Sequence, residues 1–440
     1  MRRVPNQAAK DGGPSKALPA AKLNATPRVS ALEPFKIRSF RFQWPADLCS
    51  SWAFEMETLI LGWYVLVETQ SVLMLSIYAS MQYLGTLLAP MFGVVGDRVG
   101  QRNLLSAMRG FYFLLASTTM TLAFTGLMNP YLVLGTAALM GLVRPSDIGM
   151  RTALVGETVP HAQLMGAMSI QRSTQESARI VGATSGAGLV AALGIAPAYA
   201  VVVCFYAATG LLTLQTGSAR PVKTMQAGEA APPSPWLDLK EGLAYVWNTP
   251  YLRGVMVLAF LLNMTAFPVF GGLQPYVAKS VYQSNQTTLG YLTACAASGA
   301  FFGSIVLTRF SSFLQPSRLM IYASISWYVV LFVYSQITTA PLGMAVLFFA
   351  GVAQAASLVP MAAILLRNSD QKFRGRIMGV RMLAIYSNMP GILLAGYLIP
   401  KFGYAPVAGA YCIFGIFMTV VIIYHWRKAL WQNDAPANVR

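Results

Sequence analysis

The feature of this sequence that most limits how the chain can fold is a series of apolar stretches, each about 20 residues long, that recur along nearly its whole length. A helix of about 20 residues spans about 30 Å of hydrocarbon, and a backbone inside a bilayer must satisfy its own hydrogen bonds. Charged residues make up 11% of the 440 residues, whereas soluble domains carry about 25%. The sequence therefore predicts an all-α polytopic membrane protein and excludes an ordinary soluble enzyme.

Twelve apolar stretches can be distinguished, and we expect each to form a transmembrane helix. They fall near residues 43–67, 71–95, 103–126, 130–152, 166–192, 196–216, 250–275, 287–308, 318–337, 341–365, 376–399 and 403–426. A long proline-containing connection at 217–249, with an amphipathic piece from Trp236 to Trp247, separates the first six from the last six. Two bundles linked by a helix on the membrane surface suit a duplicated transporter that rocks about a central site, although a plain tether would have the same composition.

The basic residues predict on which side of the membrane each connection lies. The connections after the odd-numbered stretches contain only Lys279 and Lys401, while arginine and lysine gather in the connections on the other side. By the positive-inside rule, that other side is cytoplasmic and holds both termini. The predicted organisation is a disordered basic cytoplasmic tail at 1–36, a six-helix bundle at 37–216, a cytoplasmic linker at 217–249, a second six-helix bundle at 250–426 and a cytoplasmic tail at 427–440.

Several kinds of chemistry are not expected. The net charge of +17 lies in the cytoplasmic connections, for which anionic lipid headgroups are a sufficient partner, and no basic patch with interleaved aromatic residues predicts nucleic-acid binding. The four cysteines, Cys49, Cys204, Cys295 and Cys412, lie in apolar stretches without paired spacing, so we expect neither disulfides nor a metal site. The sequence contains no nucleotide-binding P-loop. We therefore expect no enzyme activity and no cofactor.

The segment from Gly93 to Arg102, Gly-Val-Val-Gly-Asp-Arg-Val-Gly-Gln-Arg, resembles the G-x-x-x-D-R-x-G-R-R loop between the second and third helices of the major facilitator superfamily. Further landmarks are Leu61-Gly-Trp63, Arg151-Thr-Ala-Leu154, Ala178-Arg-Ile-Val-Gly182, Glu241-Gly-Leu-Ala-Tyr-Val246, Leu289-Gly-Tyr-Leu292 and Arg374-Gly-Arg-Ile-Met-Gly379. Together they resemble the bacterial branch that includes enterobactin-type siderophore exporters and multidrug exporters. The resemblance implies a monomeric secondary transporter with two pseudo-symmetric six-helix bundles, alternating access and the usual coupling to protons, in the bacterial cytoplasmic (inner) membrane.

The signature segment also has a physical interpretation. Asp97 stands at the cytoplasmic end of the second stretch, where its carboxylate can interact with the positive end of a neighbouring helix. The family resemblance implies that this neighbour is the eleventh helix. We expect a conformational latch composed of Gly93, Asp97, Arg98, Gly100, Arg102, Arg374 and Arg376. The alternative is a solvated turn that merely follows the positive-inside rule.

Charged side chains inside a bilayer are costly, so each is a candidate functional residue. Glu55 and Glu57 lie near the middle of the first stretch, and on a helix they point about 200° apart, so only one of them can face a central cavity. A carboxylate in that position suits a proton carrier. We prefer Glu57 over Glu55 for this role; a structural ion pair or hydrogen bond to another helix is the alternative.

Two charged faces are expected in the cytoplasmic halves of the fourth and fifth stretches. They consist of Arg144, Asp147 and Arg151 in the fourth and of Arg172, Glu176 and Arg179 in the fifth. Because the two helices are consecutive and antiparallel, we expect an interlocking salt-bridge network that closes the cytoplasmic gate; a permanent packing lock is the alternative. The two faces contain four arginines and two acids, so we expect one or two arginines to pair with another group. The candidates are Glu55, Glu57, Asp47 or an anionic substrate.

The second bundle contains no acid within its apolar stretches, so any proton chemistry belongs to the first bundle. Candidates for an aromatic and polar cavity wall are Asn263, Phe267, Phe270, Gln274, Tyr291, Trp327 and Tyr386, although a single aromatic residue can equally face lipid or core. Together these observations favour a proton-coupled exporter of a small organic molecule, siderophore-like or amphipathic and drug-like. Two alternatives stay open: a lipid or lysolipid transporter, and a non-transporting membrane receptor or scaffold.

Overall fold

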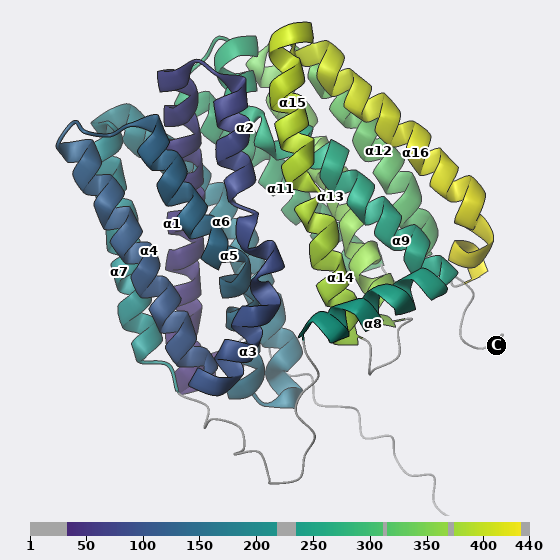
Figure 1. The fold of residues 1–440 in the computed structure, drawn as a ribbon, viewed down its shortest axis with the longest axis horizontal. Helices are drawn as coiled ribbons and strands as arrows, with labels where there is room; N and C mark the ends of the chain where they lie inside the picture. Colours follow the sequence, from purple (N-terminus) through teal and green to yellow (C-terminus); the bar gives the residue numbers. More distant parts are fainter. Residues whose placement is uncertain (1–32, 218–234, 311–314, 368–373, 433–440) are drawn as a thin grey trace, which may run out of the picture.

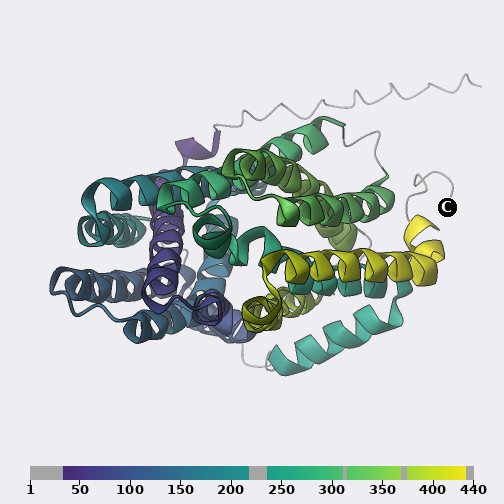
Figure 2. The ribbon, with the colours of Figure 1, turned by 90° about the horizontal axis from the view of Figure 1, so that it is seen from above.

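The computed structural model describes residues 33–217, 235–310, 315–367 and 374–432, and within these ranges the chain folds into helices without a strand. Long helices run alongside one another in two groups, which lie side by side (Figures 1 and 2). The first group consists of η1 (Glu33–Lys36), α1 (Arg38–Thr69), α2 (Val72–Met81), η2 (Leu84–Leu87), α3 (Ala89–Val99), α4 (Gln101–Phe124), α5 (Pro130–Thr158), α6 (His161–Leu193) and α7 (Ile195–Leu214). The second group follows α8 (Pro235–Asn248) and consists of α9 (Pro250–Leu261), η3 (Leu262–Ala266), η4 (Pro268–Gly272), α10 (Gln274–Tyr276), η5 (Val277–Val281), α11 (Gln286–Phe310), α12 (Pro316–Gln336), α13 (Ala340–Arg367), α14 (Arg374–Tyr386), α15 (Asn388–Phe402) and α16 (Tyr404–Gln432).

Some of these helices are pieces of one interrupted segment. The elements α2, η2 and α3 follow one another in this way, as do α9 to η5 and α14 with α15, so each group contains six crossing segments in the described ranges. This arrangement confirms the all-α fold with six helical segments in each half. The helix α8 runs crosswise at one end of the second group (Figure 1).

The same turn joins the last two crossing segments of each group. Gly194 connects α6 to α7 with φ 85° and ψ 177°, and Gly403 connects α15 to α16 with φ 83° and ψ 165°. A positive φ is readily available only to glycine, and each glycine begins a Gly-x-Ala-Pro sequence that ends at Pro197 or Pro406. A shared turn at the same place in both groups is what an internal repeat produces. We call this end of the molecule the Gly194 end and the opposite one the α8 end.

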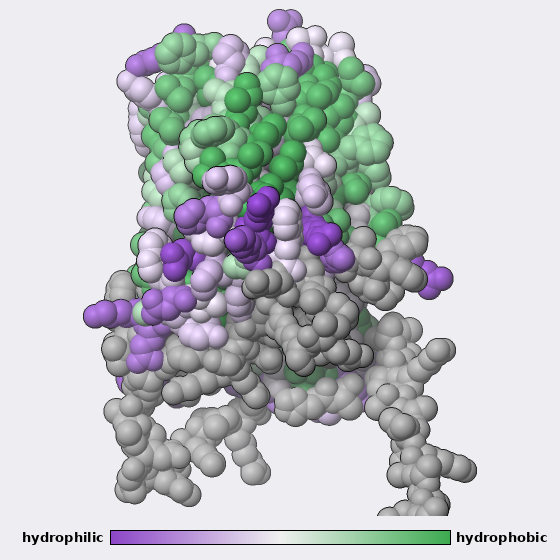
Figure 3. All heavy atoms as spheres, turned by 90° about the vertical axis from the view of Figure 1, so that its right-hand side faces the viewer, coloured by the Kyte–Doolittle hydropathy of each residue, from purple (hydrophilic) through white to green (hydrophobic). Residues whose placement is uncertain are grey.

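The exterior of the molecule suits a bilayer. Seven helical segments in the described residues are long and apolar enough to cross a membrane: Ile195–Leu214, Pro250–Val281, Gln286–Leu307, Pro316–Gln336, Ala340–Leu365, Gly379–Phe402 and Tyr404–Trp431. Six of these seven belong to the second group, because the crossing segments of the first carry more polar and charged side chains in their interior. Apolar side chains cover the upper part of the face in Figure 3, and polar side chains gather below them, toward the α8 end.

The two groups touch mainly in the half of the molecule near the Gly194 end. There a Cβ on Gly290 of α11 would lie 2.6 Å from the Cβ of Ala187 in α6. The Lys279 Nζ donates a hydrogen bond to the Leu66 carbonyl oxygen at the end of α1, over 3.3 Å. In Figure 1, α2 and α15 lie close together toward this end, whereas α3 and α14 lie further apart toward the α8 end. The two groups therefore pack most tightly against each other at the Gly194 end.

The signature segment is more helical than a loop between two spans would be. The helix α3 continues to Val99, and a single residue, Gly100 with φ 93°, connects it to α4. Arg98 is exposed, and Arg102 donates to the Thr216 carbonyl oxygen at the end of α7 over 3.2 Å. The side chains of Asp97, Arg374 and Arg376, like the environment of Gly93, lie outside the described residues. The latch therefore stays a prediction.

Within the first group, α5 and the α2–η2 segment approach each other through glycines. A Cβ on Gly141 would collide with the Met81 carbonyl oxygen, and a Cβ on Gly85 would collide with the Leu142 carbonyl oxygen. Small residues that let backbones meet are a usual basis of helix packing in membranes, because lipid gives no hydrophobic drive for helices to associate.

We expect Gly141→Ala to lower the free energy of unfolding by about 1–3 kcal/mol, because the added methyl group overpacks the contact with Met81. The matched control is Gly135→Ala in the same helix, where a Cβ would meet no atom within 4 Å. That control should be neutral or stabilising by about 0.5–1 kcal/mol, because alanine favours helix over glycine. Thermal unfolding in detergent measures both, and equal transition midpoints for the two variants would contradict the glycine contact.

Candidate functional site

A cavity of about 250 Å³ lies between the two groups of helices. Its wall on the side of the first group comes from α1, α2 and α6, and its wall on the side of the second comes from the segment around η4 and from α11, α13 and α15. The polar and aromatic residues of this wall are Phe54, Glu55, Thr58, Tyr78, Gln82, Tyr83, Arg179, Phe267, Phe270, Gln274, Thr293, Gln354 and Asn388. Such a mixture of apolar surface and few polar groups is typical of sites for small organic molecules.

Glu55 and Arg179 form an ion pair on this wall. The Glu55 Oε1 lies 3.7 Å from Nε of Arg179, which reaches it from α6. Arg179 has a second acidic partner, because its Nη1 lies 3.7 Å from Oε2 of Glu176. Glu176 in turn is 2.6 Å from Nη2 of Arg172. Among the described residues of the cavity wall, Glu55 is the only carboxylate, and it stands at the end of this chain of alternating charges.

Glu57 occupies the opposite face of α1, away from the cavity. Its carboxylate accepts hydrogen bonds from the hydroxyls of Tyr199 and Tyr206 on α7, the latter over 2.9 Å, and the residue is 3% exposed. The sequence-based preference for Glu57 as the cavity acid is therefore wrong, and Glu55 holds that position. Helix geometry requires that only one of the two faces the cavity, but it does not tell which face of α1 meets the second group.

A second set of buried charges lies deeper in the first group, toward the α8 end. Asp47 of α1 is bound by Arg109 of α4, and its other carboxylate oxygen accepts from Nε2 of Gln171 over 3.2 Å. Arg109 also donates to the hydroxyl of Thr213 in α7. The arginine is 0% exposed, so its charge must be neutralised by these neighbours and not by water.

Two residues of α5 complete this set. Nη2 of Arg151 lies 2.5 Å from Oδ2 of Asp147 and donates to Ser50 over 2.7 Å, while its Nη1 donates to Ser51 over 2.9 Å. Nε of Arg151 is also 3.8 Å from Oδ1 of Asp47. With two aspartates and two arginines, the cluster is balanced in charge, and we call Asp47, Arg109, Asp147 and Arg151 the buried tetrad.

The expected salt-bridge network between the fourth and fifth crossing segments is therefore wrong. Among the described residues, Asp147 and Arg151 of α5 pair with each other and with charges of α1 and α4. The charges of α6 pair with one another and with Glu55. The reason is that α1 packs against both α5 and α6 and receives the charged face of each. Arg144, the remaining member of the expected set, lies with its guanidinium over the ring of Phe54, where a cation–π contact replaces an ion pair.

The second group supplies an uncharged wall. Phe267, Phe270 and Gln274 line the cavity as the sequence suggested, while Tyr291 is 52% exposed at the surface of the molecule. The wall does not include Asn263, which is buried and donates to the carbonyl oxygen one turn earlier, nor Tyr386 or Trp327. Trp327 is fully buried behind the two phenylalanines.

Sequence reasoning overlooked some functional positions. Arg109 stands inside the third apolar stretch, about two turns from its start, so the rule that intramembrane charges need partners was sufficient to identify it. Gln354 and Asn388 on the cavity wall carry no such signal, because single amides inside apolar helices are common at helix contacts. No group of three or more histidine, cysteine, aspartate or glutamate residues lies together within the part of the chain that the structure describes.

Comparisons with known proteins agree with this geometry. The family described as transmembrane secretion effector matches residues 29–437. The multidrug efflux pump Tap of Mycolicibacterium fortuitum is 24% identical over 352 residues, which are 78% of this chain and 84% of the pump.

Solved structures of transporters have the same fold. The nucleoside transporter NupG superposes with a TM-score of 0.70 at 12% identity, over 88% of this chain and 99% of its own. A D-xylose–proton symporter has a TM-score of 0.67 at 12% identity, over 89% and 99% of the two chains. A bacterial homologue of the human lysosomal transporter Spinster was solved in an inward-facing and unoccupied conformation. It has a TM-score of 0.63 at 13% identity, over 90% of this chain and 98% of its own.

For the buried tetrad, we expect Arg109→Leu to lower the free energy of unfolding by about 3–5 kcal/mol, because two aspartates then share one arginine in a buried site. The double variant Arg109→Leu with Asp47→Asn should recover part of this loss, because Asp147 and Arg151 remain a balanced pair. The exposed Arg98→Leu serves as the control and should change stability by less than about 0.5 kcal/mol. Thermal unfolding in detergent is the measurement, and a double variant no more stable than Arg109→Leu alone would argue against charge balance.

Proposed function

Since the chain belongs to the transmembrane secretion effector family of major facilitator transporters, we propose that it exports a small organic molecule by alternating access and that protons drive the export. The observation that carries the proposal is the cavity between the two groups, in which Glu55 and Arg179 meet on one wall and aromatic and amide side chains form the other. The substrate is an amphipathic, drug-like or siderophore-like molecule that fits this mixture. The relation to a multidrug efflux pump supports the outward direction.

The ion pair suits Glu55 for carrying a proton. Its 3.7 Å separation from Arg179 is longer than a direct hydrogen bond, and Arg179 keeps a second acid, Glu176, at the same distance. When Glu55 takes up a proton, Arg179 therefore keeps Glu176 as an acidic partner, which it shares with the exposed Arg172. When Glu55 releases the proton, Arg179 stabilises the carboxylate that is left. A substrate in the cavity competes for the same two side chains, which couples its binding to the position of the proton.

The buried tetrad has a different part in this proposal. Its four charges compensate one another, and it ties α1 to α4 and to α5, while Arg109 also ties α4 to α7. The first group therefore moves as one rigid body. Opening toward the far side of the membrane then requires only that contacts between the groups separate at the Gly194 end, such as Gly290 against Ala187 and Lys279 against Leu66.

We further propose that the protein lies in the bacterial inner membrane as a monomer, with the α8 end in the cytoplasm. The support for this orientation is the distribution of arginine and lysine, since Arg98, Arg102 and Arg253 all lie at the α8 end. The exposed apolar side chains of α8, Leu243 and Trp247, suit a helix that rests on the membrane surface. Anionic headgroups are the expected partners of the neighbouring basic residues.

The test is transport in inside-out vesicles, with ethidium and a catecholate siderophore as the two substrates. We expect accumulation of at least one that is abolished when the proton gradient is collapsed. Glu55→Gln should remove gradient-driven accumulation, because the amide can neither take up nor release a proton there. Glu57→Gln, the matched change on the other face of α1, should lower stability but keep the dependence on the gradient.

Two results would contradict the proposal. The first is wild-type, gradient-dependent transport by the Glu55→Gln variant. The second is movement of neither substrate by a folded protein; flipping of a labelled lysolipid by that same protein would identify the lipid transporter instead.

A further inference from the structure

One segment of the second group supplies much of the cavity wall. Phe267 and Phe270, with the residues that follow up to Pro275, belong to an irregular stretch that contains wide helical turns. In one of these turns the Leu273 N–H donates to the Pro268 carbonyl oxygen, five residues back, over 3.0 Å. Such π turns recur at functional sites, and Pro268 has no N–H with which to continue an ordinary helical ladder. The backbone that carries Phe267 and Phe270 is therefore held less firmly than in a regular helix, and the position of the two rings depends on their neighbours.

Both rings rest on one buried indole. The ring centroid of Trp327 lies 5.3 Å from that of Phe267 with an interplanar angle of 88°, and 5.5 Å from that of Phe270 with an angle of 81°. These edge-to-face arrangements are the ones that aromatic quadrupoles favour. Trp327 itself is 0% exposed. It therefore contacts the wall from behind and does not reach the cavity.

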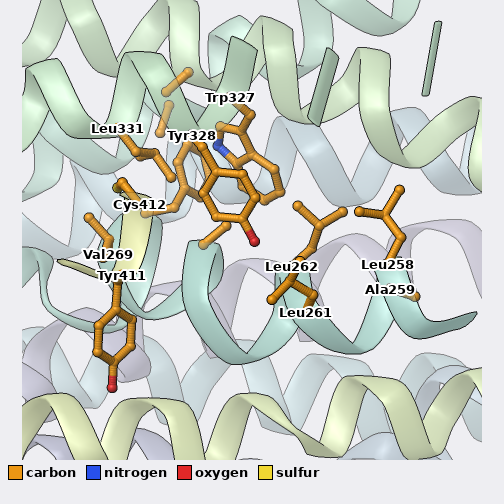
Figure 4. Close-up of a cluster of buried hydrophobic side chains, with 14 of the residues drawn as sticks. Leu258, Ala259, Leu261, Leu262, Val269, Trp327, Tyr328, Leu331, Tyr411 and Cys412 are labelled. Atoms are coloured by element: carbon orange, nitrogen blue, oxygen red, sulfur yellow. The ribbon is translucent and has the colours of Figure 1, made fainter. Parts of the chain in front are cut away.

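The helix that carries this indole is fixed to the irregular segment. The neighbouring Tyr328 hydroxyl lies 2.6 Å from Oγ1 of Thr265, in the π turn just before Phe267. Figure 4 shows Trp327, Tyr328 and Leu331 of α12 beside the turns that carry Leu261 and Leu262. Trp327 is thereby held in place relative to the segment whose rings it supports.

The two phenylalanines face an open cavity on one side and Trp327 on the other. An indole that only filled core space would pack against other buried residues, and shortening it would lower stability without affecting ligands. Trp327 belongs to the buried core of the second group, but two of the residues that it contacts, Phe267 and Phe270, also form the cavity wall. Shortening Trp327 therefore frees these two rings to turn. A wall of mobile rings offers less surface to a flat ligand than a wall of fixed rings.

We infer that Trp327 is a specificity-determining positioning residue, which holds Phe267 and Phe270 as a fixed wall for substrates that carry a planar aromatic group. The inference rests on the proposed function and adds to it the shape of the substrate. A planar ring system can pack against both phenylalanines at once, whereas a propeller-shaped molecule of the same charge cannot. Two cations of equal charge are both attracted by the faces of these rings, so a difference in their binding reports shape.

The experiment measures binding of ethidium, which is planar, and of tetraphenylphosphonium, which carries the same charge but is not planar, to the full-length protein in detergent by calorimetry. Trp327→Leu should weaken ethidium binding about tenfold through lost ring support, and change tetraphenylphosphonium binding by less than about twofold. Trp327→Phe, which retains an edge-to-face ring, should restore most of the ethidium affinity. The control is Tyr334→Leu, which is equally buried on α12 and about 10 Å away, and should not change the ratio of the two affinities.

An equal change in both affinities, or no change in either, for a folded Trp327→Leu variant would overturn the inference. So would a wild-type protein that does not bind ethidium. The binding measurement uses no gradient, so it is independent of proton coupling. Selective binding with no proton-driven transport would contradict the proposed function alone.

Discussion

Ionised side chains inside a helical membrane protein must be neutralised by one another, because neither lipid nor an apolar core solvates them. In this protein that constraint falls almost entirely on the first group of helices. The buried tetrad satisfies it internally. Glu57 is buried as well, and its carboxylate accepts hydrogen bonds from the hydroxyls of Tyr199 and Tyr206. Glu55 and Arg179 are the exception, because they meet on the wall of the cavity and are accessible from it. The proposed function therefore depends on the charges that remain accessible at the cavity.

The two groups therefore contribute different properties to one site. The first group provides charge on a rigid scaffold, and the second provides an uncharged wall on a segment with wide helical turns. Contacts between the groups concentrate at the Gly194 end and rely on small residues such as Gly290 and Ala187. Such contacts pack well but involve few ionic bonds, so they can separate and re-form during transport without leaving unpaired charges.

The class of fold could be predicted from the sequence, because the length and spacing of the apolar stretches leave a bilayer-spanning bundle as the available architecture. The sequence could not predict which partners the individual charged residues have. Periodicity shows that Asp147 and Arg151 share a face of α5, but it does not show that α1 lies against that face. For the same reason the choice between Glu55 and Glu57 depended on a tertiary contact, the position of α7 with its two tyrosines. The wall formed by Phe267 and Phe270 depends on π turns, which no apolar pattern indicates.

The central claim is that the carboxylate of Glu55 is accessible from the cavity, whereas that of Glu57 is buried on the opposite face of α1, against α7. Reaction of the purified protein with dicyclohexylcarbodiimide, which modifies accessible carboxyl groups in apolar surroundings, followed by peptide mapping tests this claim directly. The expected result is modification at Glu55, slowed by bound ethidium, with Glu57 and Asp47 unmodified. Modification of Glu57 as fast as Glu55, or of Glu57 alone, would contradict the account.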